Sequence, residues 1–244
     1  MRGSPVVVCD ETGWRVNGEN AWLHDFVTDE LTYYLIDPTR SAEPARRVLS
    51  ESYSGVMIHD GWSVYDQFLS ARHQQCLSHL IRRCQALLET ASAGAVRFPR
   101  AILALFERAM AARRRHRNGV VSTHGLKVIG GQLTSAMSRL VSPVKTHAAN
   151  ERLAAHLERH VGDLFTFLRV PGVDATNWRS EQELRPAVVN RKVWGGNRTW
   201  QGAATQSVLM TLLATCRRQN ANAIDFLAQA MRGTAALPVL EPMR

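Results

Sequence analysis

The chain has 244 residues, 45% hydrophobic and 21% charged, which suffices for one substantial core or for one core with a large insertion. No window approaches 18 uninterrupted apolar residues, which excludes a membrane-spanning helix. The four cysteines show no disulfide spacing and no signal peptide precedes the first predicted strand, so we expect a reduced, cytoplasmic protein. Thirty Lys and Arg against 21 Asp and Glu give a formal net charge of +9, which favours a polyanionic partner.

The first sixty residues have the pattern of strands. Three short apolar or β-branched runs predict antiparallel neighbours, at Pro5–Cys9, Ala21–Val27 and Leu31–Ile36. A short helix is expected over Ser41–Leu49, and Gly55–His59 returns as a fourth strand, parallel to the first. A fifth strand of this mixed sheet is expected near Gln67–Gln75, where the pattern is poor.

Beyond residue 60 the apolar period changes from 2 to 3.6, which predicts helices. Three amphipathic helices are marked by Leu77–Leu88, Ile102–Met110 and Leu153–Leu168, with Gly130-Gly131 among the breaks. After Pro171-Gly172 we expect a short helix with Asn177 or Ser180 as its N-cap, then closing helices over Ala203–Thr215 and Ala223–Met231. The predicted division is a strand-bearing core at 1–74, a helical insertion at 75–170, and core helices at 171–244.

Three acidic residues stand where a metal ligand would be useful. Asp10 follows the run Val6-Val7-Val8, Asp60 follows a second apolar run, and Glu181 lies in a polar stretch. A carboxylate at the carboxyl end of a buried strand is rigidly held yet faces solvent, and three converging carboxylates are tolerable when divalent cations neutralise them. Although an isolated strand-end aspartate is more often a turn former, the three together favour metal-dependent phosphoryl transfer on nucleic acid.

Five short motifs follow one another along nearly the whole chain. They are Asp10–Trp14 (DETGW), Gly55–Trp62 (GVMIHDGW), Cys76–Arg83 (CLSHLIRR), Asn177–Pro186 (NWRSEQELRP), and Arg191-Lys192 with Gly196–Thr199. In this order, and over a span reaching Leu227, they resemble the catalytic domain of IS66-type DDE transposases. The resemblance implies an α/β, RNase H-like mixed sheet, three antiparallel strands plus parallel strands, with a large all-α insertion between the second aspartate and the glutamate.

The same resemblance implies that Asp10, Asp60 and Glu181 hold two Mg²⁺ (or Mn²⁺) ions. Trp178 and Gln182 stand where the family pattern has Asn and Arg, so Glu183 is a rival for the glutamate position. Hard oxygen ligands suit Mg²⁺, and a pair of ions about 3.5 to 4 Å apart can activate the attacking oxygen and stabilise the leaving one. Water would nick DNA at the end of an element, and the freed 3′-hydroxyl would then attack target DNA.

The expected partner is DNA, as transposon ends and target, bound by a homo-oligomer. Five cations are expected to contact phosphate: Arg82, Arg185, Arg191, Lys192 and Arg198. Two alternatives remain open: a hydrolysis-only nuclease that uses the same acids, and an inactive or truncated DNA-binding remnant, since only four residues precede the first predicted strand. We expect binding driven mainly by phosphate contacts.

Two further groups have competing interpretations. Cys76 and His79 could face one ion from one helix, but a structural zinc site needs four ligands, so we expect packing and hydrogen bonding here and no zinc. The basic run Arg113–Arg117 is either a solvated helix end that suits the macrodipole or a DNA contact.

Overall fold

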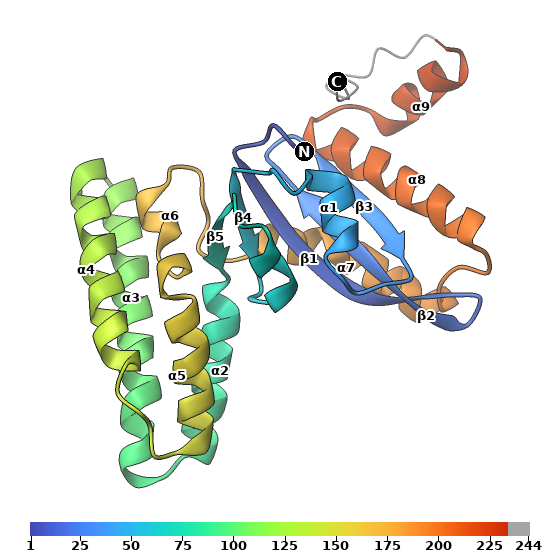
Figure 1. Cartoon of the computed structure of the whole chain (residues 1–244). Coiled ribbons are helices and arrows are strands. Elements are labelled where there is room, and N and C mark those ends of the chain that lie inside the picture. The colour runs from blue at the N-terminus through green and yellow to red at the C-terminus, as the bar shows by residue number, and fades with distance from the viewer. Residues whose placement is uncertain (234–244) are drawn as a thin grey trace. The chain divides into compact units, whose positions relative to one another are not determined.

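The computed structural model describes residues 1–233, and its strands form one five-stranded mixed sheet (Figure 1). The strands are β1 (Val6–Val16), β2 (Glu19–Val27), β3 (Thr32–Asp37), β4 (Val56–His59) and β5 (Arg72–Gln75). Their order is β3-β2-β1-β4-β5, with β2 and β3 antiparallel and with β4 parallel to both β1 and β5. This is the expected RNase H-like α/β arrangement, and β5 lies where the fifth strand was sought.

The first strand is longer than its apolar run predicts. β1 continues through Val16, and Trp14 and Val16 are buried beyond the partly buried stretch Asp10–Gly13. It then enters a two-residue turn at Asn17-Gly18, where φ is 54° and 78°, the positive values that match the twist of a hairpin. The prediction that Asp10 marks the end of a strand is therefore wrong, whereas Asp60 does follow β4 directly.

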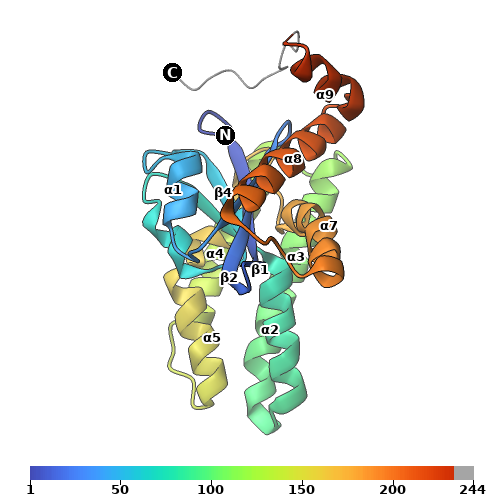
Figure 2. The same ribbon diagram turned by 90° about the vertical axis from the view of Figure 1, so that its right-hand side faces the viewer.

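Helices account for most of the remaining described residues. They are α1 (Glu43–Leu49), α2 (Leu77–Thr90), α3 (Arg97–Arg117), α4 (Thr123–Val141), α5 (Ala148–Arg159), α6 (Thr166–Arg169), α7 (Trp178–Trp194), α8 (Trp200–Arg218) and α9 (Ala223–Met231). From α2 to α6 no strand interrupts the described residues, and the long helices α2 to α5 lie side by side (Figure 2). No helix within residues 1–233 is both long and apolar enough to cross a membrane.

Three helices differ from the sequence prediction. Gly130-Gly131 lies inside α4 and does not break it. A Cβ on Gly130 would lie 3.3 Å from the Leu168 side chain, so glycine at this position permits close packing of α6. The third insertion helix ends at Arg159, and a 3₁₀ turn at Val161–Asp163 separates it from α6. The helix with Glu181 is not short: α7 spans 17 residues and continues through Pro186.

Contacts divide the chain into two units, each with its own core. The first comprises residues 10–44 and 179–233 with Met1, and its core includes Trp14, Leu23, Tyr34 and Ala203. The second comprises residues 2–9 and 45–178, where Phe106 and Phe165 are both buried with ring centroids 6.2 Å apart.

In the first unit, α8 protects the edge strand β3. Three hydroxyls one helical turn apart on α8 accept hydrogen bonds from β3 backbone N–H groups: Ser207 from Ile36 (3.1 Å), Thr211 from Tyr34 (3.0 Å) and Thr215 from Thr32 (3.3 Å). An uncovered edge presents unpaired N–H groups to other chains. Because residues at i, i+4 and i+8 share one face of a helix, this stripe satisfies the edge with side chains.

Candidate active site

The two candidate aspartates are each oriented by a backbone N–H group. Asp10 Oδ1 accepts a hydrogen bond from the Glu11 amide (2.9 Å), and Asp60 Oδ1 accepts one from the Trp62 amide (2.8 Å). The second contact closes an Asx-type turn, so Asp60 does form a turn as an ordinary strand-end aspartate would. Val8 pairs with Ile58 in the parallel register of β1 and β4, and each aspartate lies two residues beyond its member of that pair.

The loop after Asp60 is held tightly in the second unit. Gly61 has φ of +94°, and a Cβ there would lie 3.1 Å from Gln75 Oε1. That oxygen is 2.9 Å from His156 Nε2, which must therefore donate its proton. Burial, reinforced by the charge of Arg83, lowers the pKa of His156 to about 4, so a neutral histidine fixes this loop.

A chain of neutral histidines supports the end of β4. His59 Nδ1 accepts from the Gly61 amide (3.1 Å), so His59 Nε2 donates to His73 Nδ1 (3.1 Å), and His73 Nε2 donates to the Phe68 carbonyl (3.2 Å). Burial, with the neighbouring histidines, lowers the pKa of His59 well below its usual value. These rings act as hydrogen-bonding supports for the residues around Asp60.

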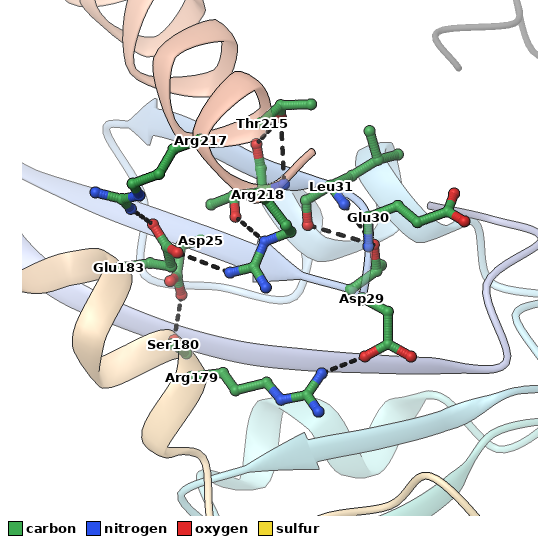
Figure 3. A network of polar contacts seen from close by, with 12 residues as sticks. Asp25, Asp29, Glu30, Leu31, Arg179, Ser180, Glu183, Thr215, Arg217 and Arg218 are labelled. Atoms are coloured by element: carbon green, nitrogen blue, oxygen red, sulfur yellow. Dashed lines mark hydrogen bonds and ion pairs between the residues drawn. The ribbon is translucent and has the colours of Figure 1, made fainter. Parts of the chain in front are cut away.

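Glu181 lies in the first turn of α7, in the first unit, and its neighbour Ser180 anchors that turn (Figure 3). Asn177 directly precedes Trp178, but its buried Oδ1 accepts no hydrogen bond from the described residues, so its side chain does not cap α7 as predicted. Ser180 is buried instead, and its hydroxyl donates to Asp25 Oδ1 at 2.5 Å. This hydrogen bond joins β2 to the start of α7 and so fixes the backbone that carries the exposed Glu181.

Asp25 is a buried acid that sequence reasoning missed. It is 0% exposed on β2, and burial, followed by the negative charge of Asp10, raises its pKa well above the ordinary value. Its Oδ2 has no hydrogen-bond partner among the described residues. Asp25 therefore brings Asp10 and the first turn of α7 to one place, and no local signal marks it because its partner is 155 residues away.

Glu183, the rival of Glu181, is engaged in ion pairs within the protein (Figure 3). Its carboxylate accepts hydrogen bonds from Arg217 Nη2 at 2.5 Å, Arg218 Nη2 at 2.7 Å and the Tyr34 hydroxyl at 3.2 Å. Glu183 is only 7% exposed. Its lone pairs are occupied in holding α7 to α8 and β3, which gives Glu183 a structural role.

The five candidate phosphate contacts fall into two kinds of environment. Arg191 is half-buried and its Nη1 donates to the Gly13 carbonyl and to Thr12 Oγ1, so it braces β1. The other four side chains are exposed: Arg82 on α2, Arg185 and Lys192 on α7, and Arg198 after α7.

The motif that contains Arg198 also has a structural role. Asn197 forms an isolated parallel bridge with Val16, and its Oδ1 accepts from Trp14 Nε1 at 2.7 Å. Gly196 has φ of +128°, and a Cβ there would meet the Arg15 carbonyl oxygen at 2.3 Å. Only glycine permits this approach, so Gly196 and Asn197 attach the segment after α7 to the end of β1.

Oxygen donors are the chemistry available at the candidate site. In the first unit the unsatisfied Oδ2 of Asp25 lies in the environment of the Asp10 carboxylate, and oxygen donors of this kind suit a hard divalent cation. Within residues 1–233, no three His, Cys, Asp or Glu side chains are gathered closely enough to hold a metal ion. Cys76 is buried at the β5–α2 junction, where its amide donates to the His59 carbonyl at 2.7 Å.

Comparison with known proteins identifies the family. The model described as "Transposase IS66 family" matches residues 1–205, from the start of the chain into α8, although the motif resemblance was expected to extend to Leu227. Neither the curated proteins nor the solved structures contain a match. A match over far more than half of the chain is decisive, and the chain belongs to the IS66 family of DDE transposases.

Proposed function

We propose that this chain is the catalytic domain of a DNA transposase that hydrolyses phosphodiesters at transposon ends and transfers the freed strand to target DNA. The observation that carries the proposal is the register of β1 and β4, in which Asp10 and Asp60 follow the Val8–Ile58 pair at equal spacing. The hydrogen bond from Ser180 to Asp25 adds the turn that bears Glu181 to the environment of Asp10.

In this proposal Asp10, Asp60 and Glu181 hold two Mg²⁺ or Mn²⁺ ions. Such ions supply charge neutralisation at the transferring phosphate and activation of the attacking oxygen. The protein's own part is positioning: the Glu11 and Trp62 amides orient the aspartates, and the Asp25–Ser180 contact fixes the first turn of α7. Exposed cations such as Arg185 and Lys192 would hold substrate phosphates, and the acting form would be a homo-oligomer on DNA.

The test is single replacement of each acid by alanine. Asp10→Ala, Asp60→Ala and Glu181→Ala should each abolish cleavage of element-end DNA in Mg²⁺ while leaving the Kd for DNA nearly unchanged, because metal ligation is lost and phosphate contacts are not. Cleavage products on a denaturing gel and fluorescence anisotropy give the two readouts. Full cleavage by the Glu181→Ala protein would remove that residue from the assignment.

The same assay separates the alternatives. Joining of a labelled end to target DNA supports strand transfer, whereas nicking without joining identifies a hydrolysis-only nuclease. Binding with neither product, in Mg²⁺ and in Mn²⁺, identifies a DNA-binding remnant.

A further inference from the structure

The positive charge of this chain is concentrated in its helical insertion. Residues 75–170 contain 15 of the 30 Lys and Arg but only 5 of the 21 Asp and Glu, so their formal charge is +10 and that of all other residues together is −1. The RNase H-like part thus has no net positive charge with which to attract a polyanion. Resting on the proposed function, we propose that the insertion holds the DNA backbone through two cationic pockets at opposite ends of α3.

The first pocket, called the tip pocket, lies between the start of α3 and the α4–α5 connection and has a volume of about 650 Å³. Arg97, Arg139 and Lys145 line it, and none of its lining residues is acidic. Arg97 and Arg139 are exposed, and Lys145 Nζ lies 4.9 Å from the centre of the Phe98 ring. The Lys145 amide donates to the Glu151 carboxylate at 2.6 Å, and its ammonium donates to the Val141 and Pro143 carbonyls. Arg97 and Arg139 are therefore the cations that favour an anionic ligand here.

The wall of the tip pocket has hydrogen-bonding capacity that the protein does not use. Asn150, only 2% exposed, donates through Nδ2 to the Ala95 carbonyl at 2.7 Å, but its Oδ1 has no partner, and neither does His147 Nδ1. Buried polar atoms usually find a partner. Both residues line the pocket. Water molecules that hydrate a bound phosphate could donate hydrogen bonds to these two atoms.

The second pocket, called the far pocket, repeats this pattern at the other end of α3. It has a volume of about 420 Å³, and Arg113, Arg117 and Arg169 line it, again with no acidic residue. Thr123, from the first turn of the 19-residue helix α4, also lines it, so the positive end of a helix dipole adds to the three cations. The basic run that ends α3 is therefore part of a pocket.

The spacing of the pockets suits a linear polyanion. Arg97 and Arg113 are sixteen residues apart on one helix, a separation of about 24 Å at 1.5 Å per residue. One DNA duplex covers that distance in about seven base pairs. Sixteen residues are about 4.4 helical turns, so the two arginines leave α3 on different sides. Both pockets still lie within the length of one DNA molecule that contacts both sides of the helix.

The experiment compares matched pairs of charge removals in the full chain. Arg97→Gln with Arg139→Gln tests the tip pocket, and Arg113→Gln with Arg117→Gln tests the far pocket. The control pair, Arg15→Gln with Arg232→Gln, removes the same charge from exposed positions outside the insertion. Fluorescence anisotropy on a random-sequence duplex without divalent metal should show each pocket pair binding about tenfold more weakly, with a salt slope smaller by roughly 1.8, and the control changing by less than about twofold.

Thermal unfolding first confirms that each variant is folded. An equal loss of affinity in the control and the pocket pairs would overturn the inference, because total charge would then be the cause. It would also be overturned if the pocket pairs lost only thermal stabilisation by inorganic phosphate and kept full DNA affinity, which would indicate small-anion sites. If the wild-type chain binds DNA through the insertion yet never cleaves element ends, the proposed function fails while this inference stands.

Discussion

Asp25 illustrates how one buried side chain connects strand and helix. It accepts the Ser180 hydroxyl, and its pKa is raised by burial and by the charge of Asp10. A carboxyl group whose folded-state pKa is raised holds its proton more tightly in the folded state. Its contribution to stability is therefore neutral below the ordinary aspartate pKa of 3.8 and becomes destabilising as the pH rises towards the folded-state pKa.

Asp25→Asn should accordingly become more stable than the wild type as the pH increases. The asparagine Oδ1 still accepts from Ser180, but the side chain cannot ionise. Urea unfolding in EDTA between about pH 4 and pH 8 measures the difference in the free energy of unfolding, which should grow in favour of the variant across that window. A constant difference at every pH would contradict the raised pKa.

The two neighbouring glutamates should separate stability from metal binding. Glu183→Gln removes a charged partner from Arg218 and Arg217 and should lower the free energy of unfolding by about 1.5 to 3 kcal/mol, while leaving Mn²⁺ affinity nearly unchanged. Glu181→Gln, at an exposed position, should do the reverse. Urea unfolding measures the free energy of unfolding, and isothermal titration measures Mn²⁺ affinity. A loss of Mn²⁺ affinity in the Glu183 variant alone would make Glu183 the metal ligand and Glu181 the structural residue.

At the scale of elements, the stripe of hydroxyls on α8 lets a helix complete the edge of a sheet. Thr211→Val keeps the shape of the side chain but leaves the Tyr34 N–H without its acceptor, which should cost about 1 to 3 kcal/mol. Thr205→Val is the matched control, since Thr205 is exposed on α8 and donates only to the Gln201 carbonyl of its own helix. Urea unfolding of both variants tests this, and equal losses would show that the edge contact contributes nothing.

Local patterns predicted some elements well and others poorly, for physical reasons. α9 has the predicted bounds because its amphipathic period is continuous and Asn222 caps it. The far half of β1 was missed because four partly buried residues, Asp10–Gly13, interrupt its apolar pattern, and α4 was missed because Gly130-Gly131 looks like a break. Gly130 lets α6 pack closely against α4, and this contact joins residues too far apart in the sequence for a local pattern to show it.

At the scale of the whole molecule, the positive charge and the three candidate acids are separated along the chain. The insertion carries a formal charge of +10, while Asp10, Asp60 and Glu181 all lie in the part whose net charge is −1. Basic side chains next to an acidic metal site would form ion pairs with its carboxylates and so compete with the metal ion for them. Half of the Lys and Arg residues, 15 of 30, lie in the insertion, which is consistent with the proposed division between chemistry and DNA holding.

The sequence by itself determined the family, the RNase H-like sheet and the positions of the three candidate acids, because short motifs and hydrophobic periods are local properties of the chain. Only the tertiary structure decided that Glu183 is engaged in ion pairs, that Asp25 lies beside Asp10, and that basic residues of the insertion line pockets. Glu183 meets Arg217 and Arg218 across 34 and 35 residues, and Ser180 meets Asp25 across 155. The chemical role of such residues depends on burial and on distant partners, which exist only once the chain has folded.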